Sequence, residues 1–319
     1  MKRVLLALAA VVVLALPAQA ENWPTKSVKL VVPFAAGSTP DIVGRLLTDY
    51  LQQKLGQPFV VENKPGASGN TGTDAVAKAD PDGYTVGISL GGPLAINQIV
   101  MGKLPYDPQA DIALVTMLVT QPSALAVHAS LNVNSVPELV ALMKANPGKY
   151  NFGSIGNGSL SHLAMEAIAL KAGTKLVHVP YPSSPQAVTA LMRNDVQMVC
   201  LPAISVTPQL ASGQIKLLAI STAQRSALLP GVPTLKEGGI DVEADAWNGL
   251  IAPARTPAPV IAAIQAAFTE AVTSPGVREK LAPQLMEAIP TTPAQFRARI
   301  DADLARWKPV IEGAGIKMN

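Results

Sequence analysis

Few residues in the sequence are spaced for catalysis or for metal binding. The three histidines are His128, His162 and His178, and none has a Glu-x-x-His or cysteine partner in the spacing of a zinc site. Ser154 and Ser159 lie in a glycine-containing stretch near His162, so a secreted serine hydrolase is one interpretation. However, no Gly-x-Ser-x-Gly motif occurs, and Ser159 and His162 share one expected helix start. We therefore expect no enzyme activity, no metal and no cofactor.

Small-residue loops that precede helices indicate a different chemistry, the binding of an anion. Residues 29–32 form a β-branched run typical of a buried strand, and residues 33–38 form a small, glycine-containing loop. A helix start follows: Thr39 can cap it, Pro40 suits its first position, and Asp41 complements the positive end of its dipole. Backbone N–H groups at such a start have no intrahelical partner and can bind an anion.

A second loop of this kind occupies residues 153–159, before a helix expected over residues 160–172. One helix start contributes about 0.3–1 kcal/mol to anion binding, and up to about 2 kcal/mol when partly buried. Micromolar affinity needs about 8 kcal/mol. Two loops that close over a ligand from opposite walls supply more donors and exclude water. The sequence therefore predicts a cleft with two walls.

The N-terminus has the pattern of a secretory signal peptide over residues 1–20. A Lys-Arg pair precedes an apolar run at 4–16, and Ala18 and Ala20 are the small residues before the expected cleavage. The lone cysteine, Cys200, can form no intrachain disulfide. We expect a soluble mature protein.

The charge of the mature chain is nearly balanced. Of the 25 Lys and Arg residues, two belong to the expected signal peptide, which leaves 23 against 22 Asp and Glu residues. No basic patch interleaved with aromatic residues occurs. Nucleic acid is therefore not an expected partner.

The patterning predicts two α/β domains. Three strand–loop–helix units follow one another between residues 29 and 99, which favours a mainly parallel sheet. The apolar run at 112–128 is typical of a crossing into a second domain, and it contains Gln121 and Pro122. More strand–loop–helix units follow that run. The expected domains are residues 21–122 together with 244–319, and residues 123–243.

The last helix of the chain is expected to return to the first domain. Thr292 is its predicted cap and Pro293 its first residue, and the helical pattern continues through Ile311. Two crossovers with a ligand cleft between the domains follow from this course of the chain.

Five segments resemble one known family, the solute-binding receptors of tripartite tricarboxylate transporters, also called Bug receptors. They lie in this order over essentially the whole mature chain: Val32–Gly37 with Asp41, Val61–Gly69, Ala79–Thr85, Gly153–Gly156 with His162, Leu163 and Glu166, and Val179–Tyr181. The resemblance implies a type II periplasmic binding protein, in which two doubly wound α/β domains are hinged by two crossing strands. It also implies a location in the periplasm.

The family resemblance further implies a carboxylate ligand: an aliphatic dicarboxylate, an acidic amino acid, a tricarboxylate or an aromatic carboxylate. The positions that would grip it, largely through backbone groups, are Ala36, Gly37, Ser38 and Thr39 on one wall and Ser154, Gly156, Asn157 and Ser159 on the other. The full expected site also includes Phe34, Asp41, Ser89, Gly91, His162, Tyr181, Ser183 and Trp247, of which Phe34 and Trp247 would be apolar contacts.

The sequence departs from the family pattern in the first loop, in the loop after Tyr181 and in the helix behind that second loop. Ser38 stands where a glycine is usual, and Pro40 stands where a threonine is usual. Residues 182–186 replace a Lys-Gly-Ser-Ala-Pro pattern, and Ala190 replaces an aspartate. Because Arg45 is the one cation close to either loop, backbone and hydroxyl recognition is favoured over an ion pair.

The predicted function is that of a monomeric receptor that delivers a small organic carboxylate to a membrane permease. An alternative is a ligand-binding sensor that docks to a membrane signalling protein. The serine hydrolase remains a third interpretation.

Overall fold

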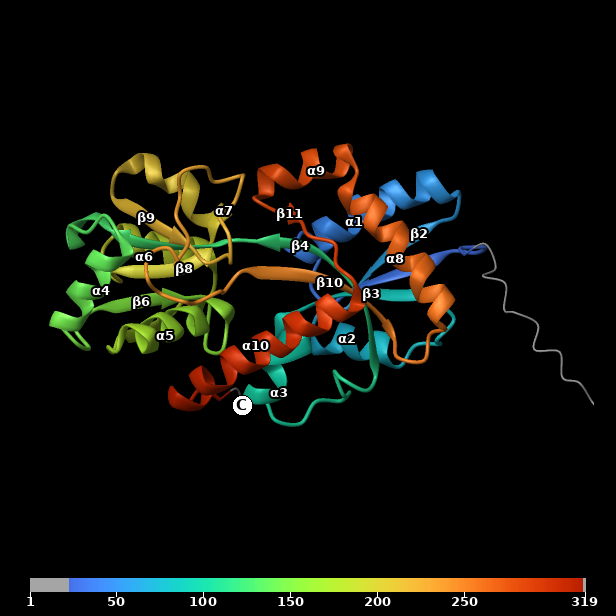
Figure 1. Ribbon diagram of the computed structural model, residues 1–319, viewed down its shortest axis with the longest axis horizontal. Helices are drawn as coiled ribbons and strands as arrows, with labels where there is room; N and C mark the ends of the chain where they lie inside the picture. The colour runs from blue at the N-terminus through green and yellow to red at the C-terminus, as the bar shows by residue number, and fades with distance from the viewer. Residues whose placement is uncertain (1–22, 318–319) are drawn as a thin grey trace, which may run out of the picture.

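The computed structural model describes residues 23–317, so the expected signal peptide lies outside the described residues. Figure 1 shows two β-sheets, each with helices packed on it, lying side by side along the long axis of the molecule. We call the part built on the six-stranded sheet the first domain and the part built on the five-stranded sheet the second domain. The α/β fold of two domains agrees with the predicted fold class.

The first sheet has the strand order β11-β4-β10-β3-β1-β2. Strand β1 pairs in parallel with β2 and β3, as the repeated strand–loop–helix units predict, whereas β10 runs antiparallel to both β3 and β4. The strands are β1 (Val28–Val32), β2 (Phe59–Asn63), β3 (Thr85–Leu90), β4 (Ile112–Gln121), β10 (Ala246–Pro253) and β11 (Glu287–Ala288).

The second sheet has the strand order β7-β6-β8-β5-β9. Strand β6 pairs in parallel with β7 and β8, and β5 pairs antiparallel with β8 and β9. The strands are β5 (Ser123–His128), β6 (Asn151–Ser154), β7 (Val177–Pro180), β8 (Met198–Pro202) and β9 (Ile215–Ile220). In both domains the carboxyl ends of parallel strands lead into the loops singled out above.

The helices cover the faces of the sheets. They are α1 (Thr39–Leu55), α2 (Asn70–Ala77), α3 (Asn97–Val100), α4 (Val136–Ala145), α5 (Leu160–Ala172), α6 (Ser184–Met192), α7 (Ala203–Val206), α8 (Ala258–Thr273), α9 (Pro275–Leu281) and α10 (Pro293–Gly313), with short helical turns η1 (Ala67–Gly69), η2 (Gly92–Ile96), η3 (Ala129–Leu131), η4 (Thr207–Ser212) and η5 (Ala282–Gln284). Within residues 23–317 no single helix has the length and apolar character of a membrane span. Helix α8 together with α9 and η5 has that length and character, but the two parts are bent by 64°.

The cap of helix α1 lies one residue earlier than predicted. Ser38, not Thr39, occupies the cap position with extended backbone angles (φ −72°, ψ 160°), and its carbonyl accepts the N–H of Ile42 at 2.9 Å. The Ser38 hydroxyl makes no capping hydrogen bond. Pro40 is therefore the second helical residue, where its missing N–H leaves no intrahelical bond unmade.

Helix α10 begins on the first domain and ends on the second, as Figure 1 shows. Thr292 is its cap, as predicted, and forms a capping box with Gln295. Phe296 packs against the backbone of β10 at Gly249, where an added Cβ would lie 2.1 Å from the ring. Farther along the helix, Trp307 and Val310 belong to the apolar core of the second domain. The last helix is therefore a third connection between the domains, beyond the two crossing segments.

Candidate ligand-binding cleft between the two domains

Asp41 holds the first loop from behind and is only 2% exposed. Its carboxylate accepts hydrogen bonds from the N–H of Gly37 (2.8 Å), from Nε of Arg45 (2.9 Å) and from Nδ2 of Asn63 (2.9 Å). Burial opposes its ionisation, but these hydrogen bonds outweigh burial and hold the pKa of Asp41 below its usual range. Asp41 thus braces the loop from behind.

The exposed part of the first loop consists of small residues. Ala36 and Gly37 are exposed, and Gly37 has a positive φ of 81° with open space where a side chain would stand. Ser38 and Thr39 are partly exposed, but the Ser38 hydroxyl oxygen is enclosed and has no hydrogen-bond partner among the described residues. The loop therefore presents mainly backbone at the start of α1, and the unpartnered hydroxyl of Ser38 lies enclosed beneath that surface.

The second loop is tied together by its own hydroxyl groups. Ser154 is fully buried; its Oγ accepts the N–H of Gly156 (3.1 Å) and lies 2.6 Å from Nε2 of His178. Ser159 caps α5: its Oγ accepts the backbone N–H of His162 (3.3 Å) and donates to the carbonyl of Gly156 (2.7 Å). These contacts define the loop's shape. Ser154 contacts the ring of His178, not that of His162, and has no exposed surface. Ser159 contacts the backbone of His162 instead of its ring, so neither serine pairs with the His162 ring as the hydrolase interpretation expected.

Two stacked histidines lie under the second loop. The rings of His162 and His178 are 3.7 Å apart and nearly parallel, and Phe152 stacks on His178 at 5.0 Å. Nδ1 of His162 accepts the N–H of Gly158 (3.1 Å), which leaves Nε2 to carry the proton and to face Glu166 at 3.6 Å. Burial, followed by the nearby His162, lowers the pKa of His178 to about 4. His162 is buried and supports the loop.

For three further expected site residues the structure shows contacts or positions within the local secondary structure. Ser89 is fully buried on β3 and shares a hydrogen bond with Thr73 (2.9 Å). Tyr181 is partly buried against Gly153, and its backbone N–H donates to the carbonyl of Ser154 (2.9 Å). Ser183 occupies the cap position of α6 without a side-chain capping bond.

Asn157 links the second loop to the end of the chain. The residue is exposed, and its Nδ2 donates to the backbone carbonyl of Lys317 at 3.0 Å. The sequence contains no signal for this contact, because 160 residues separate its partners.

A cavity of about 260 Å³ lies where the two domains meet. Three larger hollows do not border the first loop: two, of about 340 and 720 Å³, involve the second domain or the end of α10, and one, of about 320 Å³, lies on the first domain. Three expected site residues, Phe34, Gly91 and Trp247, line the interdomain cavity. Residues that sequence reasoning missed complete its wall: Leu90, Gly92, Ile96, Ile155, Leu160, Asp245, Ala246, Arg299, Asp303 and Trp307.

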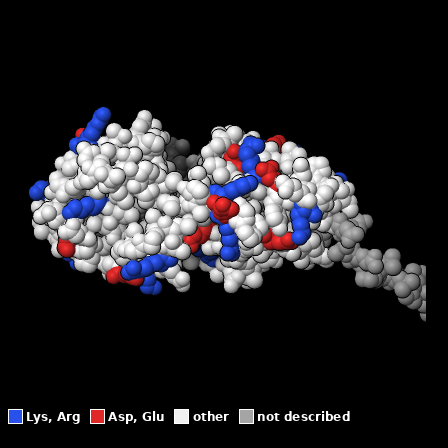
Figure 2. Space-filling model, turned by 90° about the horizontal axis from the view of Figure 1, so that it is seen from above, with Lys and Arg blue, Asp and Glu red and all other residues white. Residues whose placement is uncertain are grey.

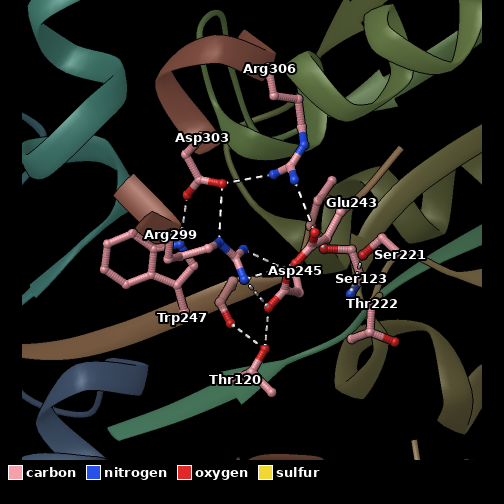
Figure 3. Close-up of polar contacts among 12 residues, drawn as sticks. Thr120, Ser123, Ser221, Thr222, Glu243, Asp245, Trp247, Arg299, Asp303 and Arg306 are labelled. Carbon is pink, nitrogen blue, oxygen red and sulfur yellow. Dashed lines mark hydrogen bonds and ion pairs between the residues drawn. The ribbon is translucent and has the colours of Figure 1, made fainter. Parts of the chain in front are cut away.

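The indole of Trp247 is fixed in the wall of this cavity. Its Nε1 donates to Asp303 of α10 at 2.8 Å, and Phe296 meets the ring edge-on at a centroid distance of 5.4 Å. Gly91 lies against the indole, and a Cβ there would be 3.5 Å from the ring. Figure 3 shows Trp247 beside Asp303 and Arg299. The fixed ring gives the cavity a rigid aromatic side.

A network of charges lies next to the crossing segment that enters β10 (Figure 3), and three of its members, Asp245, Arg299 and Asp303, line the cavity. Arg299 contacts Asp245 (2.7 Å), Glu243 (2.9 Å) and Asp303 (3.1 Å), and Arg306 contacts Asp303 (2.7 Å) and Glu243 (2.9 Å). Although burial works against the Arg299 charge, the surrounding carboxylates, led by Asp245, raise its pKa further. Burial raises the pKa of Glu243. The guanidinium of Arg299 is therefore fully engaged by protein carboxylates.

Charges elsewhere do not form a patch of a single sign on the face drawn in Figure 2, where Lys and Arg lie next to Asp and Glu. Among residues 23–317 no group of three or more His, Cys, Asp or Glu side chains is arranged to hold a metal ion.

The family follows from comparison with known proteins. Residues 43–316 match the family described as the tripartite tricarboxylate transporter family receptor. The chain belongs to this receptor family. The resemblance of the five sequence segments to Bug receptors is thereby confirmed. Protein BugT of Bordetella pertussis is 34% identical over 307 residues, which cover 96% of this chain and 94% of that protein.

Solved structures of this receptor family have the same fold. A TctC solute-binding protein from Polaromonas, solved without ligand, has a TM-score of 0.82 and 30% identity, over 91% of this chain and 99% of its own. A Rhodopseudomonas palustris protein solved with adipate has a TM-score of 0.76 and 33% identity, over 92% of this chain and 99% of its own. MatC of the same organism, solved with malate, has a TM-score of 0.71 and 29% identity, over 91% of this chain and all of its own.

Proposed function

We propose that this receptor captures a small organic carboxylate between its two domains and delivers it to a membrane permease of the tripartite tricarboxylate type. The observation that carries the proposal is the position of two loops, one before α1 and one before α5, at a single interdomain cavity. The relatives solved with adipate and with malate support a carboxylate as the ligand.

The donors in this proposal are mainly backbone groups. In the first turn of α1, the N–H groups of Thr39 and Asp41 have no intrahelical partner, and Pro40 between them has no N–H. The enclosed hydroxyl of Ser38 can donate to the same anion, and the exposed Ala36 and Gly37 let a ligand approach the backbone closely. Arg45 is held by Asp41, so it does not pair with the ligand.

The first turn of α5 supplies the donors of the opposite wall. The N–H groups of Leu160 and Ser161 have no intrahelical partner there, whereas those of Gly156, Gly158 and Ser159 are used inside the loop. Gly156 and Ser159 therefore shape this wall, and Asn157 stands at its exposed edge.

Closure of the two walls would take place about the crossing segments. We keep residues 21–122 with 244–319, and residues 123–243, as the proposed hinged domains, although the end of α10 packs in the core of the second domain. The strands β4 and β5 meet at Pro122, and the second crossing leads into β10. Closure excludes water and strengthens every polar contact with the anion. The proposed receptor works as a monomer in the periplasm and is not an enzyme.

A thermal-shift panel tests the carboxylate ligand. The purified protein is heated with mono-, di- and tricarboxylates, acidic amino acids and aromatic carboxylates, each paired with its amide. A ligand at one hundred times its dissociation constant adds about 2.7 kcal/mol to the free energy of unfolding, which raises the unfolding temperature visibly. We expect at least one acid, but not its amide, to do so. The proposal fails if no carboxylate stabilises the protein at millimolar concentration.

The permease partner needs a separate test. Cells that contain a tripartite permease encoded beside this receptor should take up the identified ligand only when the receptor is also present. Uptake that is unchanged without the receptor would point to a sensing role instead.

A further inference from the structure

The interdomain cavity is lined almost entirely by apolar groups. Phe34 and Leu90 come from the first domain, Ile155 and Leu160 from the second, and Trp307 from α10. Ile155 is 40% exposed although it is a large apolar residue, and it lies directly after the buried Ser154 of the second loop. Ile155 therefore extends the apolar lining of the cavity to its exposed edge.

The charged groups on the inner side of the cavity carry an excess of carboxylates. Three charged side chains line the cavity: the carboxylates of Asp245 and Asp303 and the guanidinium of Arg299. Glu243 and Arg306 belong to the same network of ion pairs but lie outside the lining. Arg299 is the one basic residue that lines the cavity among residues 23–317, and each of its contacts is with a carboxylate of the network. This side of the cavity therefore offers no free cation to an incoming anion.

The cavity also has the size of a small ligand body. Its volume of about 260 Å³ lies just below the range of about 300–1,000 Å³ found for sites that hold drug-sized ligands. The fixed indole of Trp247 forms one rigid side, and Phe34 adds a second aromatic surface.

We propose that the ligand is a monocarboxylate with an apolar body. Its carboxylate binds at the loops before α1 and α5, and its uncharged body fills the cavity bounded by Phe34, Ile155, Leu160 and Trp247. This inference rests on the carboxylate-binding function proposed above and narrows it. A second carboxylate at the far end of the ligand would be buried beside Asp245 and Asp303 without a cation, which is strongly unfavourable. An apolar body in the same place gains by leaving water.

Matched acids that differ only at the far end test this ligand class. Isothermal titration compares hexanoate with adipate and benzoate with terephthalate, so that aliphatic and aromatic bodies are distinguished. We expect each monocarboxylate to bind at least thirty-fold more tightly than its dicarboxylate. A third aliphatic ligand, 6-aminohexanoate, tests whether the acidic wall instead selects a cationic end, and we expect it to bind more weakly than hexanoate.

A charge placed in the cavity tests the site itself. Ile155→Lys adds an ammonium group at an exposed position, where folding tolerates it, and Ile155→Met is the matched uncharged control of similar length. We expect Ile155→Lys to reduce the monocarboxylate preference at least tenfold and Ile155→Met to retain it. Thermal unfolding of each variant without ligand verifies that both are folded. An Ile155→Lys variant that keeps the wild-type preference would place the ligand body elsewhere.

The outcomes separate this inference from the broader function. Tighter binding of adipate or terephthalate, or of 6-aminohexanoate, overturns the monocarboxylate assignment and leaves a carboxylate receptor. If none of these five acids binds while a tricarboxylate or an acidic amino acid stabilises the protein in the thermal-shift panel, the monocarboxylate assignment alone is overturned. If no carboxylate of that panel stabilises the protein, the proposed function is overturned as well.

Discussion

Asp41 and Ser154 are polar side chains on binding loops that act on the loop itself. Three donors occupy the carboxylate of Asp41, and the hydroxyl of Ser154 is enclosed between Gly156 and His178. A loop built from small residues has few packing contacts of its own, so buried hydrogen bonds behind it must define its shape. Both residues therefore position the backbone groups that we propose as ligand donors.

Replacement of Asp41 tests this positioning role. In Asp41→Asn the amide group would face at least one of the donors on Gly37, Arg45 and Asn63, so one buried hydrogen bond is lost. We expect the free energy of unfolding to fall by about 1–3 kcal/mol and carboxylate affinity to fall at least tenfold. Asp49→Asn, the same change at an exposed position of α1, is the control and should alter neither urea unfolding nor titration. Equal effects of the two variants would contradict the role of Asp41.

His178 gives the protein a defined acid sensitivity. Its pKa is lowered from an ordinary 6.5 to about 4, so the folded state binds the proton less readily than the unfolded state. The corresponding stability is complete above pH 6.5 and is lost as the pH falls toward 4. Because the ring is partly exposed, we expect a loss of about 1–3 kcal/mol in that window.

The same change at two histidines identifies the source of this acid sensitivity. Urea unfolding between pH 7 and pH 4 should show a smaller loss in His178→Gln, which does not titrate. His128→Gln removes the ring that caps η3 through Ser130, and the loss between pH 7 and pH 4 in this variant should stay as large as in wild type. A wild-type pH profile in His178→Gln would contradict the assignment.

At the scale of elements, the caps of two second-domain helices allow a matched comparison. Ser159 caps α5 at the cleft, and Ser135 caps α4; each Oγ accepts the N–H of the third helical residue at 3.3 Å. Both Ser159→Ala and Ser135→Ala should therefore lower the free energy of unfolding by about 1 kcal/mol. Only Ser159→Ala should also weaken carboxylate binding, because its Oγ holds the carbonyl of Gly156. Unchanged affinity in Ser159→Ala would place the ligand away from the start of α5.

At the scale of the whole molecule, the charge network joins α10 to the crossing segment between the domains. The side chains of Asp245 and Asp303 are 4% and 3% exposed; Arg299 pairs with both, and Asp303 is also paired with Arg306. Because removal of one partner leaves buried charge behind, Arg299→Ala should lower the free energy of unfolding by about 3–5 kcal/mol.

The matched change Arg297→Ala lies on the same helix, at a residue for which no ion pair is found among residues 23–317. Surface substitutions of this kind usually stay within about 0.5 kcal/mol of wild type. Urea unfolding of the two variants measures the difference in their free energies of unfolding. A loss in Arg299→Ala as small as that in Arg297→Ala would mean that the network does not stabilise the assembly of the two domains.

Strands, helices and caps whose partners are close in the chain can be predicted from this sequence. The β-branched run before Pro33, the small-residue loop and the helix start at Thr39 are adjacent in the chain, so propensity and capping rules predict β1 and α1 to within one residue. Thr292 is likewise a correct cap because its partner, Gln295, is three residues away. The segment motifs were sufficient to indicate the receptor family and hence the class of fold.

The contacts between side chains at the cleft depend on the tertiary structure and could not be predicted from the sequence. Trp247 and Asp303 are 56 residues apart, and Ser154 and His178 are 24 residues apart on neighbouring strands. Hydrophobic period and capping patterns describe contacts within one element, whereas these pairs depend on strand order and on the path of α10 across both domains. For this reason the apolar lining, with Ile155, Leu160 and Trp307, and the acidic inner wall emerged only from the folded chain.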